Sequence, residues 1–185
     1  MKIDTGIWAH FKTITKHKFI VCIECIKCGQ VWRGIMHDNS KFGPTEFLSS
    51  ARYFQGTRSP IEAEKIEKGY SLAWQHHMGH NPHHWEYWID FDNDGNIIAN
   101  KIPYQYVVEM VCDWIGAGKV YNKNNWNQSA PLDYYMKVRK GRYFHPDTEK
   151  LLLKFLGAIN ASGLYTFHLF ARSKTLQQEY NNGNI

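Results

Sequence analysis

The sequence predicts an all-α fold, a helical bundle that forms one domain over residues 1–185. Three observations predict it. Apolar residues recur at helical spacing in several segments, glycine or proline marks where several of these segments end, and no repeat, low-complexity linker or shift in composition divides the chain. A chain of this length can also bury a sizeable core without disulfide bonds.

Apolar spacing and turn residues define the predicted helices. Gly29 is a C-terminal stop for the first helix, the Gly43-Pro44 pair forms the turn before the third, and Pro82 ends a segment rich in histidine. The last residues, about eight of them, are polar and are expected to fray. Helices are predicted at about 6–28, 30–36, 45–56, within 57–81 after a loop, 104–122, 147–160 and 164–176.

Residues 89–103 are rich in turn formers and predict a short hairpin or loop insertion. Asp90, Asp92, Asp94 and Gly95 follow the order of a calcium-binding loop. The position that should supply the bidentate carboxylate is Lys101. The segment is therefore interpreted as a turn stabilised by Asn and Asp side chains.

Composition limits the classes of function. Hydrophobic residues make up 43% of the chain and charged residues 21%, which is ordinary for a globular protein, whereas 15% aromatics and ten histidines are unusual. The net charge of +5 is spread along the chain, so it suits an anionic small substrate and permits nucleic acid without implying it. With no long apolar stretch and no secretion signal at the N-terminus, we expect a cytoplasmic protein that makes no membrane contact.

Cys22, Cys25 and Cys28 form a C-x2-C-x2-C pattern, which can bind zinc or an iron-sulfur cluster. On a helix, however, Cys22 and Cys28 are about 120° apart and about 9 Å apart along the axis, so they cannot share one metal. We interpret them as core thiols, because free cysteine is usually buried.

Four side chains are candidate ligands for one divalent metal: His17, His37, Asp38 and Asp113. A turn at Gly29 lets two antiparallel helices face His17 and His37 inward. Neighbours on an ideal helix diverge by about 100°, so Asp38 reaches the same ion only if the helix ends there.

Asp113 interrupts an otherwise apolar helix, and a buried carboxylate is costly unless it is paired or bound to a metal. An ion pair at a solvated helix edge is the alternative for Asp113. Glu109, one turn earlier on the same face, is expected to take part in catalysis by hydrogen-bonding a ligand or a metal-bound water.

Five histidines crowd into nine residues in the segment HHMGHNPHH, where Pro82 allows the chain to turn. They are candidates for a second metal site. The alternative is a metal-free layer in which histidines pack against Trp74, Trp85 and Trp88. The five are His76, His77, His80, His83 and His84.

The order His17, His37-Asp38, Asp113 resembles the HD-domain superfamily, whose members bind divalent metals and mostly cleave phosphate esters. HDNSK is similar to the HD-x-x-K form of that superfamily, which implies that Lys41 contacts phosphate. The resemblance implies an HD-like helical bundle in which Asp38 and Lys41 serve catalysis, alongside the role expected above for Glu109. Two-metal members carry extra histidines, which implies a second site at His77, His83 and His84, with His76 and His80 as further candidates.

Nearly the whole chain also resembles an uncharacterised family of Firmicutes and their phages. The motifs that carry this resemblance keep their order along the chain. They include HFKTITKHK, MHDNSKFGPTEF, YFQGTRSP, AWQHHMGHNPHHWEYW, VVEMVCDW and FHPDT.

The expected function is metal-dependent hydrolysis of a nucleotide or another small phosphate ester by a metal-activated water. One or two ions of Mn, Fe, Co, Ni, Zn or Mg would suit mixed histidine and carboxylate ligands. Lys41, Arg58 and Arg33 are expected to neutralise phosphate, and Trp74 to stack on the substrate. Two alternatives remain open: an HD-fold di-iron oxygenase, and a non-enzymatic metal-binding or host-interaction module of phage origin. The sequence does not fix the metal, the substrate or the oligomeric state.

Overall fold

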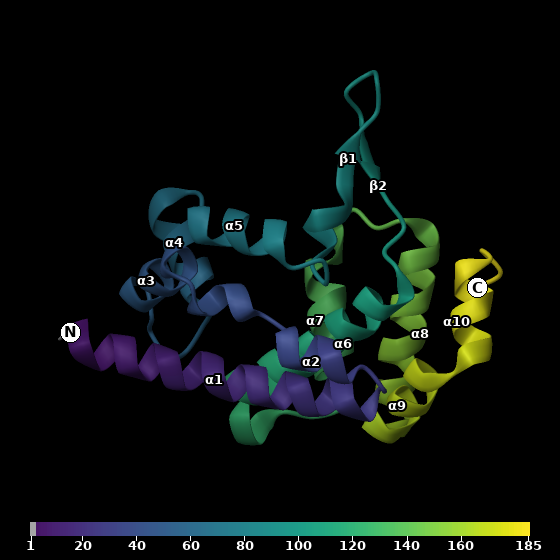
Figure 1. The fold of residues 1–185 in the computed structure, drawn as a ribbon, viewed down its shortest axis with the longest axis horizontal. Coiled ribbons are helices and arrows are strands. Elements are labelled where there is room, and N and C mark those ends of the chain that lie inside the picture. Colours follow the sequence, from purple (N-terminus) through teal and green to yellow (C-terminus); the bar gives the residue numbers. More distant parts are fainter. Residues whose placement is uncertain (1–2) are drawn as a thin grey trace.

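The computed structural model describes residues 3–185 and confirms the all-α prediction. In Figure 1, the long helix α1 (Ile3–Lys27) runs along one side of the molecule, and a two-stranded hairpin stands away from the helical body. The other helices are α2 (Val31–Met36), α3 (Pro44–Arg52), α4 (Pro60–Lys68), α5 (Leu72–His80), α6 (Tyr104–Tyr121), α7 (Ala130–Val138), α8 (Pro146–Ser162), α9 (Leu164–Arg172) and α10 (Lys174–Asn181). Short 3₁₀ turns include η1 (Asn39–Phe42), η2 (Trp85–Trp88), η3 (Lys123–Asn125) and η4 (Arg139–Gly141).

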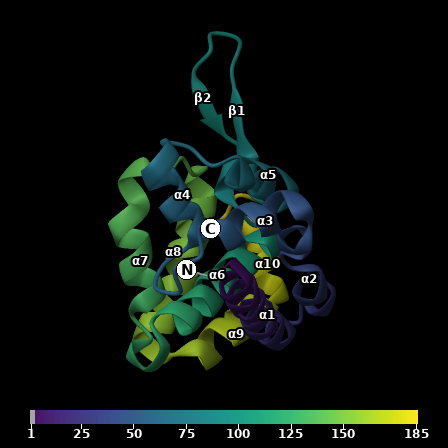
Figure 2. The ribbon, with the colours of Figure 1, turned by 90° about the vertical axis from the view of Figure 1, so that its left-hand side faces the viewer.

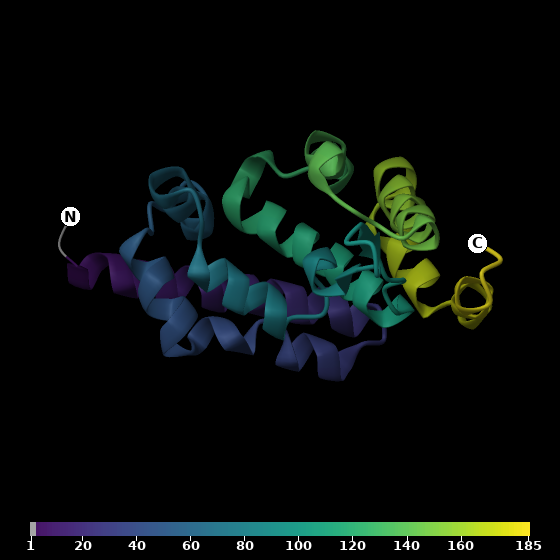
Figure 3. The same ribbon diagram turned by 90° about the horizontal axis from the view of Figure 1, so that it is seen from above.

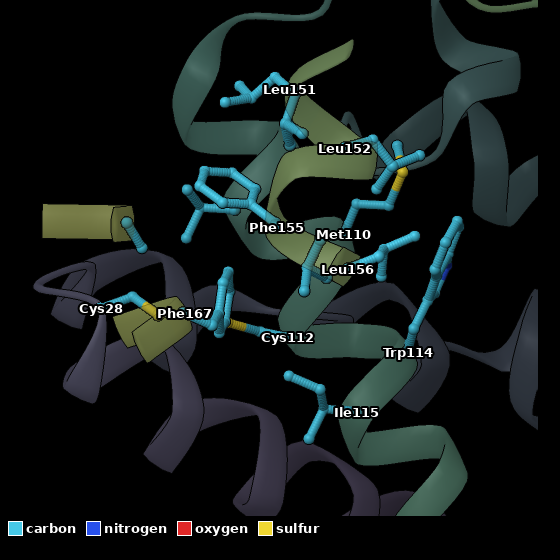
Figure 4. Close-up of a cluster of buried hydrophobic side chains, with 14 of the residues drawn as sticks. Cys28, Met110, Cys112, Trp114, Ile115, Leu151, Leu152, Phe155, Leu156 and Phe167 are labelled. Carbon is cyan, nitrogen blue, oxygen red and sulfur yellow. Dashed lines mark hydrogen bonds between the residues drawn. The ribbon is translucent and has the colours of Figure 1, made fainter. Parts of the chain in front are cut away.

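Helix α6 is the centre of the bundle. It lies between α1 on one side and α7 and α8 on the other (Figure 3), and its residues 107–116 are all buried. Apolar side chains of α6 meet those of α8 and α9 in the main core (Figure 4). Labelled members of this core are Cys28, Met110, Cys112, Trp114, Ile115, Leu151, Leu152, Phe155, Leu156 and Phe167. A charged residue within this stretch of α6, such as Asp113, is therefore held inside the protein.

Gly116 sets the close approach of α6 to α1. A Cβ atom at this position would lie 2.4 Å from Val21 Cγ2 and 3.5 Å from two ring atoms of His17. Val21 is fully buried and cannot move aside easily. The glycine thus lets α1 carry His17 against the same stretch of α6 that carries Asp113.

Gly116→Ala should lower the free energy of unfolding by about 1–3 kcal/mol through overpacking, which exceeds the gain of about 1 kcal/mol in helix propensity. Chemical denaturation monitored by circular dichroism measures this change. Gly157→Ala, in α8, is the matched control, because no atom lies within 4 Å of the added Cβ and only the propensity gain applies. Equal stability changes in the two variants would contradict the close approach.

The hairpin predicted for residues 89–103 is confirmed. Strands β1 (Ile89–Phe91) and β2 (Ile97–Ala99) pair antiparallel, with Ile89 opposite Ala99, and they project from the helices in two perpendicular views (Figures 1 and 2). Asp92 Oδ1 accepts hydrogen bonds from the backbone N–H groups of Asp94 and Asn96. The acidic segment is a side-chain-stabilised turn, as the sequence indicates.

The cysteine prediction is also confirmed. Helix α1 is continuous through Cys22 and Cys25 and ends at Lys27, one residue before Cys28. Cys25 and Cys28 are buried and Cys22 is half-buried. Cys28 Sγ lies 3.8 Å from Cys112 Sγ of α6, and burial raises the pKa of the Cys112 thiol. These thiols contribute to packing.

The structure corrects the expected C-terminal end of the chain. The predicted helix over 164–176 breaks at Ser173, whose side chain accepts a hydrogen bond from the backbone N–H of Leu176 and so begins α10. Within the last eight residues, where fraying is expected, Tyr180 is 1% exposed and its hydroxyl donates to the carbonyl oxygen of Ile102. The buried Tyr180 holds α10 against the core although the residues around it are polar.

One other helix end and one whole helix differ from the predictions. Helix α3 ends at Arg52 rather than near Gly56, and the structure contains α7, for which the sequence analysis predicted no element. In the described part of the chain, no helix is both long enough and apolar enough to cross a membrane.

Candidate metal centre

The His37-Asp38 pair lies where α2 ends. His37 leaves the helix with φ −49° and ψ 128°, and Asp38 follows in the left-handed region with φ 52° and ψ 27°. A non-glycine residue in this region is uncommon, although aspartate tolerates it better than most. This backbone change removes the divergence of about 100° between helical neighbours, so both side chains turn into the protein. Each of them is 1% exposed.

A first cluster gathers His17 from α1, His37, Asp38 and Asp113 from α6. His17 Nε2 lies 3.0 Å from Asp113 Oδ1 and 3.4 Å from His37 Nε2. Asp38 Oδ2 lies 3.3 Å from His37 Nε2 and 3.6 Å from His17 Nε2. Ligand atoms about 2.1 Å from one ion are themselves about 3.0–3.4 Å apart, so these spacings fit a single divalent ion.

A second cluster gathers His77, His83 and His84 around the other oxygen of Asp38. Asp38 Oδ1 lies 3.4 Å from His77 Nε2 and 3.4 Å from His83 Nε2. His84 Nε2 lies 2.8 Å from His77 Nε2. Asp38 therefore presents one carboxylate oxygen to each cluster, as a ligand that bridges two ions does.

Two buried atoms of the second cluster lack a hydrogen-bond partner among the described residues: Asp38 Oδ1 and His83 Nε2. A buried polar atom without a partner costs about 1–3 kcal/mol. Such atoms need an explanation, and an ion between these two would satisfy both. The residues present thus fit a divalent metal at the second cluster as well as at the first.

Carboxylates behind the histidines fix the orientation of the rings. Glu109 Oε1 lies 3.1 Å from His37 Nδ1 and 3.3 Å from His83 Nδ1, so one carboxylate orients a histidine of each cluster. Glu46 Oε2 lies 2.7 Å from His77 Nδ1. Metal-binding histidines commonly donate their second ring N–H to such a carboxylate, which leaves Nε2 free for the ion.

The electrostatics of the clusters favour cations. Burial opposes ionisation of Asp38, but His37 and Lys41 outweigh it and hold the pKa of Asp38 well below its ordinary value. Burial likewise opposes ionisation of Asp113, and His17 and His37 overcome it, so its pKa is also lowered. Both carboxylates are therefore charged at neutral pH.

Two histidines of the second cluster, His77 and His84, are held in the neutral form. Burial, followed by the charge of His83, lowers the pKa of His84 well below 6.5, and burial also lowers the pKa of His77. Neutral imidazole is the form that binds a metal. His37 differs: burial lowers its pKa, but Asp38, Asp113 and Glu109 raise it above 6.5, so an ion has to displace a proton there.

The expected substrate-contacting residues lie in different environments. Lys41 pairs with Asp38 at the clusters, and its side chain is 25% exposed. The Arg33 guanidinium stacks 3.8 Å above the Tyr106 ring, and its Nη1 lies 3.5 Å from Glu109 Oε2. Arg58 donates from Nε to Gln55 Oε1 in its own loop, so its observed contact is local.

The crowded histidines separate into two groups. His76 Nδ1 contacts Glu46 Oε1 at 2.7 Å, and His80 Nδ1 contacts the carbonyl oxygen of His76 at 2.7 Å, so neither belongs to a cluster. Trp74 packs edge-on to His84 with ring centroids 4.9 Å apart. Trp85 instead faces Tyr143 and Phe144, and Trp88 donates to the carbonyl oxygen of Pro82. Of the three tryptophans, Trp74 is the one packed against histidines of a cluster.

Three buried acids were not predicted from the sequence: Glu24, Glu46 and Glu64. Glu46 follows the start of α3, where acidic residues are common for helix-dipole reasons alone, so its role behind His77 gave no distinct signal. Glu24 is 2% exposed and contacts Lys119 and His168. Glu24 could have been predicted, because it is a charge within the apolar stretch FIVCIECIK, and the same observation, a charge in an apolar helix, identified Asp113.

Comparison with known proteins gives one match. The sequence model of a family described as a family of unknown function (DUF5662) matches residues 6–158. No curated protein and no solved structure matches the chain.

Proposed function

Because this chain belongs to the DUF5662 family, to which no function is attached, we propose its function from the metal centre: a two-metal phosphohydrolase of the HD type. The substrate class is a nucleotide or another small phosphate ester. The observation that carries the proposal is the bridging position of Asp38, whose two oxygens face two separate groups of ligand atoms.

Ligand chemistry supports a pair of ions rather than one. The first cluster offers two histidines and two carboxylates, and the second offers three histidines and the shared Asp38. Ions bridged by one carboxylate are typically about 3.5–4 Å apart, the separation used by two-metal phosphoesterases. Mixed nitrogen and oxygen ligands do not select among Mn, Fe, Co, Ni, Zn and Mg.

The residues of this chain have separate tasks in the proposed reaction. Bound ions would supply an acidified water and polarise a phosphoryl oxygen. Lys41, charged and partly exposed beside Asp38, would pair with a phosphate oxygen of the substrate. Glu109 and Glu46 would hold the imidazoles of His37, His83 and His77 in place, which makes them positioning residues.

The second histidine-rich cluster also favours one other activity. Three histidines and a bridging carboxylate suit iron, and an HD-fold di-iron oxygenase would use the same side chains. Iron as the bound metal, with oxygen consumption and no phosphate release, would replace the proposed function with this one.

Metal content tests the proposal directly. Elemental analysis should find two ions per wild-type chain and about one in either His17→Ala or His84→Ala, because each variant removes a ligand from one cluster only. His80→Ala is the matched control, since His80 is exposed and outside both clusters. Reconstituted wild-type protein should release phosphate in a panel of nucleotides and phosphate monoesters. A wild-type chain that binds no divalent metal would rule the proposal out.

A further inference from the structure

A cavity of about 940 Å³ opens beside the metal centre, between α2, the segment around Pro82, α6, α9 and α10. Cavities of about 300–1,000 Å³ hold small molecules up to the size of a nucleotide. Trp32, 71% exposed, and Tyr106 supply aromatic surface, and amide side chains of Gln30, Asn81 and Gln177 supply polar groups. The cavity is large enough and varied enough for a specific ligand.

Charge on the cavity wall favours an anion. Arg33 from α2, Arg172 from α9 and Lys174 from α10 line it, with Glu109 as the only carboxylate among the described lining residues. Arg172 and Lys174 are exposed, and neither forms an ion pair with a carboxylate in the described chain. Arg172 donates from Nη2 to the carbonyl oxygen of Ile26 at 3.2 Å, so its charge is hydrogen-bonded but not neutralised. Two cations from separate helices thus lack a neutralising carboxylate and favour an anionic ligand.

The cavity is separate from the reaction centre. Of the seven side chains in the two clusters, His83 alone lines the cavity. Its Nε2 points to Asp38 at 3.4 Å, while its Nδ1 faces Glu109 at 3.3 Å. A molecule in the cavity therefore meets the Glu109 carboxylate and the His83 ring, which stand between it and the ions.

Arg33 connects the cavity to the metal ligands. Its guanidinium lines the cavity and also contacts Glu109 Oε2 at 3.5 Å, while Glu109 Oε1 holds His37 and His83. We propose that the cavity is an effector site for a nucleotide-sized anion, which competes with Glu109 for Arg33 and so changes how firmly Glu109 orients a histidine of each cluster. The regulatory half of this proposal rests on the proposed metal centre; the binding half does not.

Isothermal titration calorimetry on metal-stripped protein tests the binding half, with AMP and inorganic phosphate as probes. AMP should bind, and phosphate should bind more weakly. The double variant Arg172→Gln with Lys174→Gln should weaken AMP binding by about tenfold or more, because two charge-assisted contacts are lost. Lys154→Gln, an exposed lysine of α8 outside the cavity, is the matched control and should bind AMP as the wild type does.

Competition between AMP and Glu109 for Arg33 can be tested in metal-stripped protein. Glu109→Gln should tighten AMP binding several-fold, because Arg33 loses its carboxylate partner, and Arg33→Gln should weaken it. Absence of AMP binding, or AMP binding that survives the double variant, would overturn the effector site. These outcomes need no metal, so they are distinct from a failure of the proposed function.

Coupling is measured on protein that binds Mn²⁺. Saturating AMP should tighten Mn²⁺ binding several-fold in the wild type, since a Glu109 carboxylate released from Arg33 is a stronger acceptor for His37 and His83. Binding coupling is reciprocal, so Mn²⁺ should tighten AMP binding by the same factor. The factor should shrink in Arg33→Gln. An equal factor in that variant would overturn the regulatory role.

Discussion

Asp38→Asn should remove both proposed ions and lower phosphate-ester hydrolysis by roughly a thousandfold or more. Changing a residue that only hydrogen-bonds a metal ligand typically lowers metal affinity or activity by about 10–100-fold, so the loss expected here is larger. The Asp38 carboxylate presents one anionic oxygen to each cluster, where the proposed ions would bind. The amide keeps the shape but has one neutral oxygen, and its NH2 group would face one of the ions. Metal analysis and phosphate release measure the two effects.

The Asn variant is a close match to the wild type in other respects. Asn, like Asp, visits the left-handed backbone region that residue 38 occupies, so the end of α2 should be preserved. Melting of metal-stripped wild type and variant, followed by circular dichroism, serves as the folding control. A folded Asn variant that keeps two ions and full activity would show that Asp38 does not bridge.

Glu24→Gln should give the largest loss of stability, about 3 kcal/mol at neutral pH. This value is at the lower end of the cost of breaking a buried ion pair, because the cations that pair with Glu24 are partly exposed. Glu24 of α1 accepts from Lys119 of α6 at 2.9 Å and contacts His168 of α9 at 2.7 Å. It thereby joins three helices. Burial would raise the pKa of Glu24, but these two partners outweigh it and lower the pKa to about 2.

The stability contributed by the Glu24 carboxylate should also depend on pH. Its pKa in the folded protein is below the ordinary value of 4.5, so its contribution is complete above about pH 4.5 and is lost as the pH falls toward 2. Denaturant unfolding at pH 7 and at low pH should show the gap between wild type and Glu24→Gln closing as the solution is acidified. A gap that stays constant would mean that the pKa of Glu24 is the same in the folded and the unfolded protein, so that its ionisation contributes nothing to stability. Lys154→Gln, away from Glu24, should follow the wild type throughout.

The fold was largely predictable because its signals are local. Gly29, with φ +78°, ends the first helix, and the turn formers of residues 89–103 give the hairpin. The burial of Tyr180 depends on long-range contacts with Ile102 and Thr148, which no local pattern contains. Helix α7 was missed because it has only 9 residues, fewer than the roughly 11–18 over which an apolar repeat is recognised.

The candidate site was predictable in its residue types and order, and less so in its geometry. A charge in an apolar helix indicated Asp113, and the same reasoning applies to Glu24. Spacing alone could not separate His77 from His76, because both lie on α5 and both contact Glu46. Which of the two rings faces Asp38 depends on how α5 packs in the folded protein. The position of Asp38 between the two clusters depends on its own left-handed backbone conformation, and sequence periodicity carries no information about that conformation.

The cluster residues occupy a shorter segment of the chain than the folded core does, because the core also includes helices α9 and α10. Every side chain of the two clusters precedes residue 158, where the family match ends. Phe167, Leu176 and Tyr180, which close the core, come after it, as do two of the cations on the cavity wall. A chain shortened to the matched segment would keep all the ligands yet expose its apolar interior, so the family boundary is a poor guide for expressing this protein.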